Sequence, residues 1–221
     1  MNQQESGLSF ERVVFFSDAV FAIVITLLVL EIRPPHLEEL SNAALNHALF
    51  GLLPKIIGFV ASFLITGSMW IEHHRLFRYI RDYDGGLLWR NLLLLMLVSF
   101  VPFPTALSSE YYWSQSAFIL YAVSLGAVGL AKLWVWKYAA GNRQLLVDDI
   151  DKLTVKRITR RSLAVPIACG FAVALAFLNI RLASLGFVLI PILARLLDPT
   201  RRKKSMPADA SLQSVQQTQN S

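Results

Sequence analysis

The sequence predicts an all-α membrane protein with six transmembrane helices. Hydrophobic residues make up 55% of the 221-residue chain, charged residues make up only 16%, and the apolar residues fall into long blocks. Such blocks are typical of helices that cross a bilayer, because a span needs about 20 mostly apolar residues. The net charge of +6 comes from Lys and Arg residues that collect between alternate blocks, which favours a membrane protein over a nucleic-acid-binding one.

The first expected span covers residues 12–32 and follows a short polar lead at residues 1–11. No charged residue lies between Asp18 and Glu31, and Pro34 ends the span because proline cannot continue a helix. A retained helix is predicted rather than a cleavable signal peptide, since no small-residue cleavage site follows a short apolar core.

Five further spans follow, separated by polar segments. They are expected at residues 52–70, 87–101, 113–136, 163–178 and 182–197. Residues 36–50 form a loop with a possible short helix, and the second span continues as a polar helix through residue 81. The third span stops near Pro102, and residues 137–161 form a charged connection between the fourth and fifth spans.

Shorter signals complete the domain of residues 12–198. Residues 84–86, Asp-Gly-Gly, break the chain before the third span, and residues 179–181 form a tight turn before the sixth. Pro191 is expected to kink the sixth span. Residues 199–221 are basic at first, then polar and poor in aromatic residues, which predicts a disordered cytoplasmic tail.

The distribution of basic residues predicts the orientation. With the N-terminus inside, 17 of the 21 Lys and Arg residues lie on the inner side and only Arg33 and Arg181 on the outer side. Because Lys and Arg collect on the cytoplasmic side of membrane proteins, both termini are expected in the cytoplasm. Lys55 and Lys132 lie within spans and are expected to snorkel to the outer and inner interfaces.

The opening turns of the first span carry polar residues that a simple anchor does not need. Arg12, Phe16, Ser17 and Asp18 form an Arg-x-x-x-Phe-Ser-Asp motif. An ionisable residue at membrane depth costs roughly 2.5–3.5 kcal/mol on insertion scales, so these residues are candidates for a functional role. At the start of the first of six hydrophobic segments, the motif resembles the signature of the transmembrane protein 175 family, over roughly residues 8–198.

That family consists of cation channels, mainly potassium-permeable. The resemblance implies that the chain is a channel for potassium ions, needs no cofactor, and assembles in the lipid bilayer as a homotetramer around a central pore lined by the first helix. Animal members carry two six-helix repeats, whereas this chain has one. The single repeat points by resemblance to a prokaryotic plasma membrane.

A stripe of large aliphatic residues runs along the first span. On a wheel of 100° per residue, seven residues lie within about 40° of Ile23, namely Arg12, Phe16, Ala19, Ile23, Leu27, Leu30 and Pro34. In the family, rings of isoleucine or leucine narrow the pore, so the resemblance implies a hydrophobic constriction at Ile23, Leu27 and Leu30. Thr26 flanks the stripe, but a threonine in a helix usually bonds its own backbone. Packing or contact with lipid is the alternative explanation of the stripe.

Ser17 and Asp18 point away from this stripe and need partners inside the bundle. The candidates at the same depth are His73, His74, Arg90 and Asn91. In the family, the signature residues join a polar network that holds the pore helix. A metal site is the alternative, but adjacent histidines on a helix diverge by about 100°, which is poor geometry for chelation.

Two other classes of function compete with a channel. A secondary transporter of a cation or small solute is expected to show inverted repeats or helices broken near the midplane, and Pro191 is the only hint of a break. An enzyme is not expected, because the sequence has no Gly-x-Ser-x-Gly or His-Glu-x-x-His motif. The single cysteine, Cys169, is expected to be an apolar filler within a helix.

Overall fold

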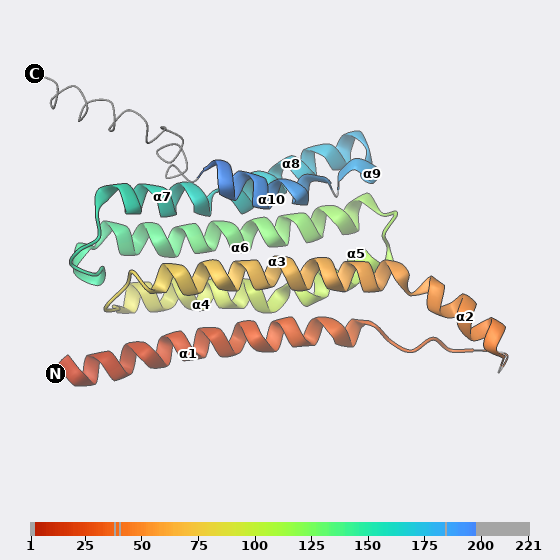
Figure 1. Cartoon of the computed structure of the whole chain (residues 1–221), viewed down its shortest axis with the longest axis horizontal. Helices are drawn as coiled ribbons and strands as arrows, with labels where there is room; N and C mark the ends of the chain where they lie inside the picture. Colours follow the sequence, from red (N-terminus) through yellow and green to blue (C-terminus); the bar gives the residue numbers. More distant parts are fainter. Residues whose placement is uncertain (1–2, 38, 40, 184, 198–221) are drawn as a thin grey trace, which may run out of the picture.

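The computed structural model describes residues 3–37, 39, 41–183 and 185–197. Its long helices run side by side with roughly parallel axes, whereas the short helix α2 runs obliquely away from them (Figure 1). The long helices are α1 (Gln3–Leu27), α3 (Leu53–Phe77), α4 (Gly85–Phe100), α6 (Gln115–Gly141) and α8 (Ala164–Leu178). The shorter ones are η1 (Leu28–Glu31), α2 (Asn42–Gly51), α5 (Pro102–Glu110), η2 (Arg143–Leu145), α7 (Lys152–Ser162), α9 (Ile180–Ala183) and α10 (Leu185–Leu196). The all-α class is therefore confirmed.

Within the part of the chain that the structure describes, five segments are long and apolar enough to cross a membrane. They are Phe10–Glu31, Leu53–Phe77, Gly85–Glu110, Gln115–Gly141 and Lys152–Leu178. The sixth expected span coincides with α10, whose 12 residues form a shorter apolar helix. Six complete spans therefore stay a prediction, and the predicted tail at 199–221 lies outside the described residues.

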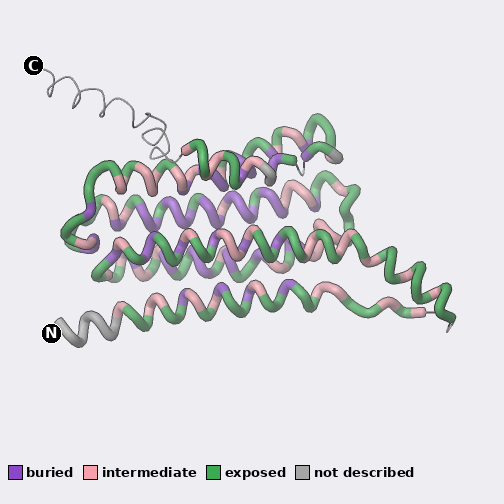
Figure 2. The backbone as a smooth tube through the Cα atoms, viewed as in Figure 1, coloured by how far each residue is buried: buried purple, intermediate pink, exposed green. Residues whose placement is uncertain are grey.

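Helix α6 is the centre of the bundle. It packs against α4 on one side and α8 on the other, and its buried residues include Trp136, Leu125 and Val128. Helix α1 lies at the opposite edge. Among the long helices of the described structure, it makes substantial contact with α3 and α4 only. Figure 2 shows this difference, because purple positions recur along α6 whereas green positions recur along α1.

The ends of several elements differ from those predicted. Helix α1 begins at Gln3, within the expected polar lead, and its last turn tightens into the 3₁₀ helix η1. The chain stays helical beyond Pro102, because proline at the first position of a helix loses no hydrogen bond. Residues 36–50 include the start of α2, whose first turn is capped by the Ser41 side chain.

The charged connection at 137–161 is also more ordered than predicted. Helix α6 continues to Gly141, and Asp151 caps α7 by accepting a hydrogen bond from the Thr154 amide at 3.0 Å. Between them, Leu146 pairs with Ile80 in an isolated antiparallel bridge. This Asp-capped, basic segment forms a helix because its apolar residues Val155 and Ile158 pack against the core.

Close packing of α10 on α8 depends on Gly186. A Cβ atom added there would lie 2.5 Å from the Cβ and 2.7 Å from the Cα of Ala172. By contrast, a Cβ added at Gly170 on α8 would meet nothing within 4 Å. The two glycines therefore form a matched pair, one at a helix contact and one in open space.

We expect Gly186→Ala to destabilise the protein by about 1–3 kcal/mol, because the two helices must separate to admit the methyl group. Gly170→Ala should leave stability unchanged or raise it slightly, since alanine favours the helix. Thermal unfolding of the purified protein in detergent measures both variants. Equal melting temperatures for the two variants would contradict the close packing of α10 on α8.

Candidate functional site

Helix α1 has one buried face, which holds it against the bundle. Ser17, Phe21, Val24 and Leu28 are all buried at spacings of four, three and four residues. This spacing places them on one side of α1 and its continuation η1. Helix α1 packs there against α3 and α4, and η1 packs against α3 and α5. The polar residue Ser17 thus lies on the same face as three apolar core residues.

The opposite face of α1 is bare in the single chain. Phe16, Ile23, Leu27 and Leu30 are all exposed, and Ile23 reaches 58% exposure. Leu30 lies on η1, where residues three apart eclipse one another, so it falls directly above Leu27. The aliphatic stripe therefore continues through the change from α-helix to 3₁₀ helix.

Thr26 also lies on the exposed side of α1. Its hydroxyl donates a hydrogen bond to the Ile23 carbonyl oxygen at 2.8 Å. The hydroxyl hydrogen is thus committed to a hydrogen bond within the helix. The hydroxyl oxygen can still accept a hydrogen bond or contact a cation.

Ser17 is joined to α4 and α3 by a chain of buried hydrogen bonds. Its hydroxyl donates to the Val13 carbonyl oxygen at 2.9 Å and accepts from the Asn91 amide nitrogen at 2.9 Å. The Asn91 amide oxygen lies 3.1 Å from Nε2 of His73. Because an amide oxygen can only accept, Nε2 of His73 carries the hydrogen in this arrangement. His73 also stacks on Phe77 at a ring distance of 4.3 Å.

Asp18 has a different partner from those considered in the sequence. Its carboxylate accepts a hydrogen bond from Nε1 of Trp70 at 2.9 Å. The Trp70 ring in turn lies 5.9 Å from the ring of His74, so His74 borders the network without bonding to Asp18 in the described contacts. Sequence reasoning missed Trp70, although it lies three residues before His73 and hence on the same face of α3.

Arg90 belongs to another cluster, at the start of α4. Its guanidinium lies 3.8 Å from the Tyr138 ring centroid and 4.7 Å from that of Trp134, and it donates to the Gly86 carbonyl oxygen. Tyr138 donates to Asp84, which also caps α4. Partial burial acts to raise the pKa of Asp84, but hydrogen bonds from Tyr138 and the α4 amides outweigh it and lower that pKa. Arg90 thus ties α4 to α6 rather than to Asp18.

Arg12 is exposed and lines a cavity of about 530 Å³ between α1 and α4, together with Phe16 and Asn91. The motif residues therefore divide into two groups. Ser17 and Asp18 bond to neighbouring helices, whereas Arg12 and Phe16 face open space in the single chain. Among the residues that the structure describes, no group of three His, Cys, Asp or Glu side chains is arranged to hold a metal ion.

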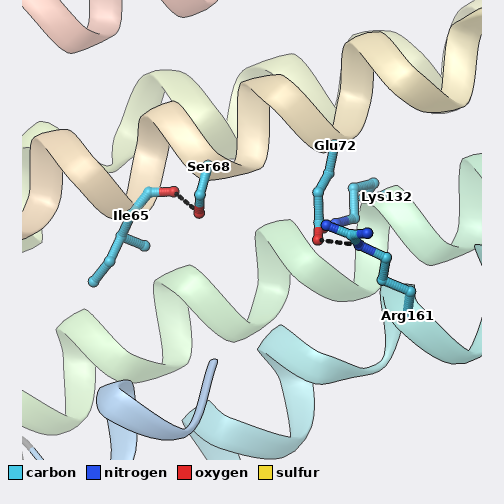
Figure 3. A network of polar contacts seen from close by, with 5 residues as sticks. All are labelled: Ile65, Ser68, Glu72, Lys132 and Arg161. Carbon is cyan, nitrogen blue, oxygen red and sulfur yellow. Dashed lines mark hydrogen bonds and ion pairs between the residues drawn. The ribbon is translucent and has the colours of Figure 1, made fainter. Parts of the chain in front are cut away.

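The prediction that Lys132 snorkels to the interface is wrong. Lys132 is only 3% exposed and forms an ion pair with Glu72 of α3, while Nε of Arg161 lies 3.4 Å from the other oxygen of the same carboxylate (Figure 3). Glu72 lies on the side of α3 that faces α6, so Lys132 finds an anion inside the bundle. Lys132 is 60 positions and Arg161 is 89 positions from Glu72 in the sequence, so no helical periodicity could predict these contacts.

These features define a multi-span α-helical membrane protein whose first helix is anchored along one face and bare along the other. Residues 12–102 match the model of the family described as endosomal/lysosomal potassium channel TMEM175. A potassium channel of Chamaesiphon minutus is 39% identical over 184 residues, which are 82% of this chain and 89% of that protein. One from Streptomyces collinus is 36% identical over 204 residues, 86% of this chain and 96% of its own length.

A solved structure agrees with the sequence comparisons. The crystal structure of a lysosomal potassium-selective channel TMEM175 homolog from Chamaesiphon minutus superposes with a TM-score of 0.74 and 36% identity, covering 86% of this chain and 98% of that one. The chain belongs to the TMEM175 family, which is a family of ion channels and not of enzymes.

The hydrogen bond between Asp18 and Trp70 predicts coupled mutations. Asp18→Ala and Trp70→Phe should each lower the stability of the purified protein by about 1–3 kcal/mol, because each leaves the other partner unsatisfied. The double variant should cost clearly less than the sum of the two. Trp89→Phe, the same change at an exposed position of α4, is the control and should be nearly neutral. Fully additive losses would show that Asp18 and Trp70 do not interact.

The ion pair of Glu72 predicts an asymmetry between its two ends. Glu72→Gln leaves the buried ammonium of Lys132 without an anion, which costs about 3–5 kcal/mol when a buried pair is broken. Lys132→Met should cost less, because Glu72 keeps Arg161. Combining Glu72→Gln with Lys132→Met should recover part of the loss. Thermal unfolding measures all three, and a larger loss for Lys132→Met than for Glu72→Gln would contradict the arrangement.

Proposed function

We propose that the chain is a potassium-permeable cation channel that assembles as a homotetramer, with α1 of each copy around a central pore. The observation that supports this most directly is the bare aliphatic face of α1, opposite its anchored face. One copy leaves this face at the edge of the bundle (Figure 1). Rotational symmetry around an axis beside α1 brings identical faces together and encloses a path. The potassium channels among its relatives support the choice of ion.

In this proposal Ile23, Leu27 and Leu30 form successive rings that constrict the pore. A ring of aliphatic side chains passes an ion only when the ion gives up part of its water. Potassium holds its hydration shell less tightly than sodium, so such a ring favours potassium. The preference is weak, because aliphatic side chains offer no oxygen to replace the lost water. Thr26 contributes at most one hydroxyl oxygen beside the rings.

The polar network on the other face of α1 fixes which side chains point at the axis. Ser17 bonds to Asn91, and Asp18 bonds to Trp70, so α1 is tied at adjacent residues to two different helices. Rotating α1 by one residue position would break both contacts and leave the buried amide of Asn91 unpaired, which costs about 1–3 kcal/mol. Within the motif, Ser17 and Asp18 therefore act on permeation through the position of the stripe, whereas Arg12 and Phe16 lie on the exposed side of α1.

The proposed placement is a prokaryotic plasma membrane with both termini in the cytoplasm. The excess of Lys and Arg between the second and third spans and between the fourth and fifth supports this orientation. It requires an even number of spans, and α10 supplies the sixth. The Lys55–Glu110 ion pair, at 2.5 Å, then lies at the outer end of the bundle.

The rings predict the effect of side-chain bulk at Ile23. Ile23→Ala should raise the potassium current and bring sodium and potassium permeabilities closer together, because a wider ring lets ions keep more water. Ile23→Asn should act in the same direction, since a polar side chain wets the constriction. The measurement is current and reversal potential under bi-ionic sodium and potassium, with the purified full-length protein in liposomes.

Ile57 on α3 provides the matched control, because it is the same residue type and is 65% exposed. Ile57→Ala should leave both current and reversal potential unchanged. Unchanged behaviour of both Ile23 variants, or equal effects at Ile23 and Ile57, would contradict a constriction at Ile23. Absence of potassium conductance in the unmodified protein would contradict the channel itself.

A further inference from the structure

Two cavities meet on the face of α3 that points away from α1. One, of about 510 Å³, lies between α3 and α10 and has a mainly apolar lining that includes Leu64, Ile65, Phe187, Ile190 and Ala194. The other, of about 400 Å³, lies between α3 and α7 and is lined by Arg75, Arg78, Arg157 and Arg161 among others. Both cavities share Glu72, Arg75 and Arg161. An apolar cavity thus opens directly into a basic one.

The apolar cavity has little capacity to bind a polar ligand. Its one hydroxyl, on Ser68, donates to the Ile65 carbonyl oxygen at 2.7 Å (Figure 3). The remaining lining away from the charged end is aliphatic or aromatic, apart from Pro191. Hydrocarbon is the kind of group that such a surface favours.

The charged end carries a net positive charge. Glu72 is the only acidic residue in the described lining of either cavity, and its charge is offset by the buried Lys132. Arg161, which also contacts Glu72, and Arg75 and Arg195 therefore remain in excess. Arginine binds phosphate oxygens through two parallel hydrogen bonds, so this cluster fits a phosphate group.

The distance between the two ends matches half a bilayer. Leu64 and Arg75 are eleven residues apart on α3, which corresponds to roughly 16 Å at the rise of an α-helix. The hydrocarbon core of one leaflet is about 15 Å thick. A phosphate beside Arg75 thus places an attached acyl chain along the apolar cavity as far as the middle of the membrane.

We propose that this surface binds an anionic phospholipid, with its phosphate between Arg75, Arg161 and Arg195 and one acyl chain in the cavity between α3 and α10. Basic pockets between helices at the cytoplasmic surface are recognised sites for such lipids. A soluble phosphate uses only the basic part, and leaves the apolar cavity unexplained. Lipid binding does not depend on whether the chain conducts ions, so this proposal can be tested separately from the proposed channel function.

The test measures lipid binding to the full-length protein. The probe is phosphatidylglycerol, titrated against the purified protein in detergent and followed by native mass spectrometry, with phosphatidylcholine of the same acyl chains as the reference lipid. Phosphatidylglycerol should bind more tightly than phosphatidylcholine. Arg75→Gln combined with Arg195→Gln should weaken its binding about thirtyfold, given the contribution of each basic residue to anionic lipid binding. Arg161 is left intact because it contacts Glu72.

The control is Arg143→Gln combined with Lys152→Gln, which removes two exposed charges outside both cavities and should leave binding unchanged. Ala194→Phe fills the apolar cavity without changing charge and should also weaken phosphatidylglycerol binding, while inorganic phosphate competes poorly.

An equal loss of phosphatidylglycerol affinity in the two double variants that remove charge would overturn the proposal in favour of general electrostatic attraction to the protein surface. Unchanged binding in Ala194→Phe with strong competition by inorganic phosphate would overturn it in favour of a soluble anion. A change of oligomer size in Arg75→Gln with Arg195→Gln would assign the surface to a second copy of the chain and overturn it.

Discussion

The attachment of α1 to the bundle by one buried face, which includes a polar network, is the constraint on which the rest of the structure depends. In a bilayer no water is available to satisfy polar side chains, so Asp18 and the remaining bonding capacity of Ser17 are matched by groups on other helices. Asn91 and Trp70 supply them, at 2.9 Å in each case. Because those partners lie on α4 and α3, α1 cannot rotate freely, and its opposite face must present Ile23, Leu27 and Leu30 outward. A buried network thus decides the exposure of residues that make no polar contact.

The charged groups inside the membrane region serve a different purpose. Glu72, Lys132 and Arg161 join α3 to α6 and to the end of α7. A buried ion pair adds little net stability, because desolvation offsets its attraction, but it fixes which helix faces which. Helix α3 is thereby held by Glu72 toward α6, by Trp70 toward α1 and by His73 toward α4. It is the helix through which the outer part of the bundle positions α1.

Local patterns in the sequence predict most of the fold, but they do not predict which residues of different helices contact one another. Hydrophobic blocks predict the spans, and a wheel of 100° per residue sets Ser17 and Ile23 on different sides of α1. Depth alone makes His73 and Asn91 candidates, and both do join Ser17 in the structure. The expected depth in the membrane does not distinguish Arg90 from Trp70 as the partner of Asp18, because the choice of partner depends on how α3 and α4 are rotated about their axes. The same ambiguity hides the partner of Lys132, which only the packing of α3 on α6 brings near.

Accessibility of the α1 stripe to a permeant reagent tests the central claim most directly. Cysteine is placed at Ile23 in a Cys169→Ala background, and potassium current through liposomes is followed while silver ions are added. A ring of thiolates at a constriction binds silver and blocks the current. Rapid block is therefore predicted for Ile23→Cys and none for Ile57→Cys, although Ile57 on α3 is the more exposed of the two in the single chain. Current through Ile23→Cys that silver leaves unchanged, or block that is equally rapid in Ile57→Cys, would contradict a pore lined by α1.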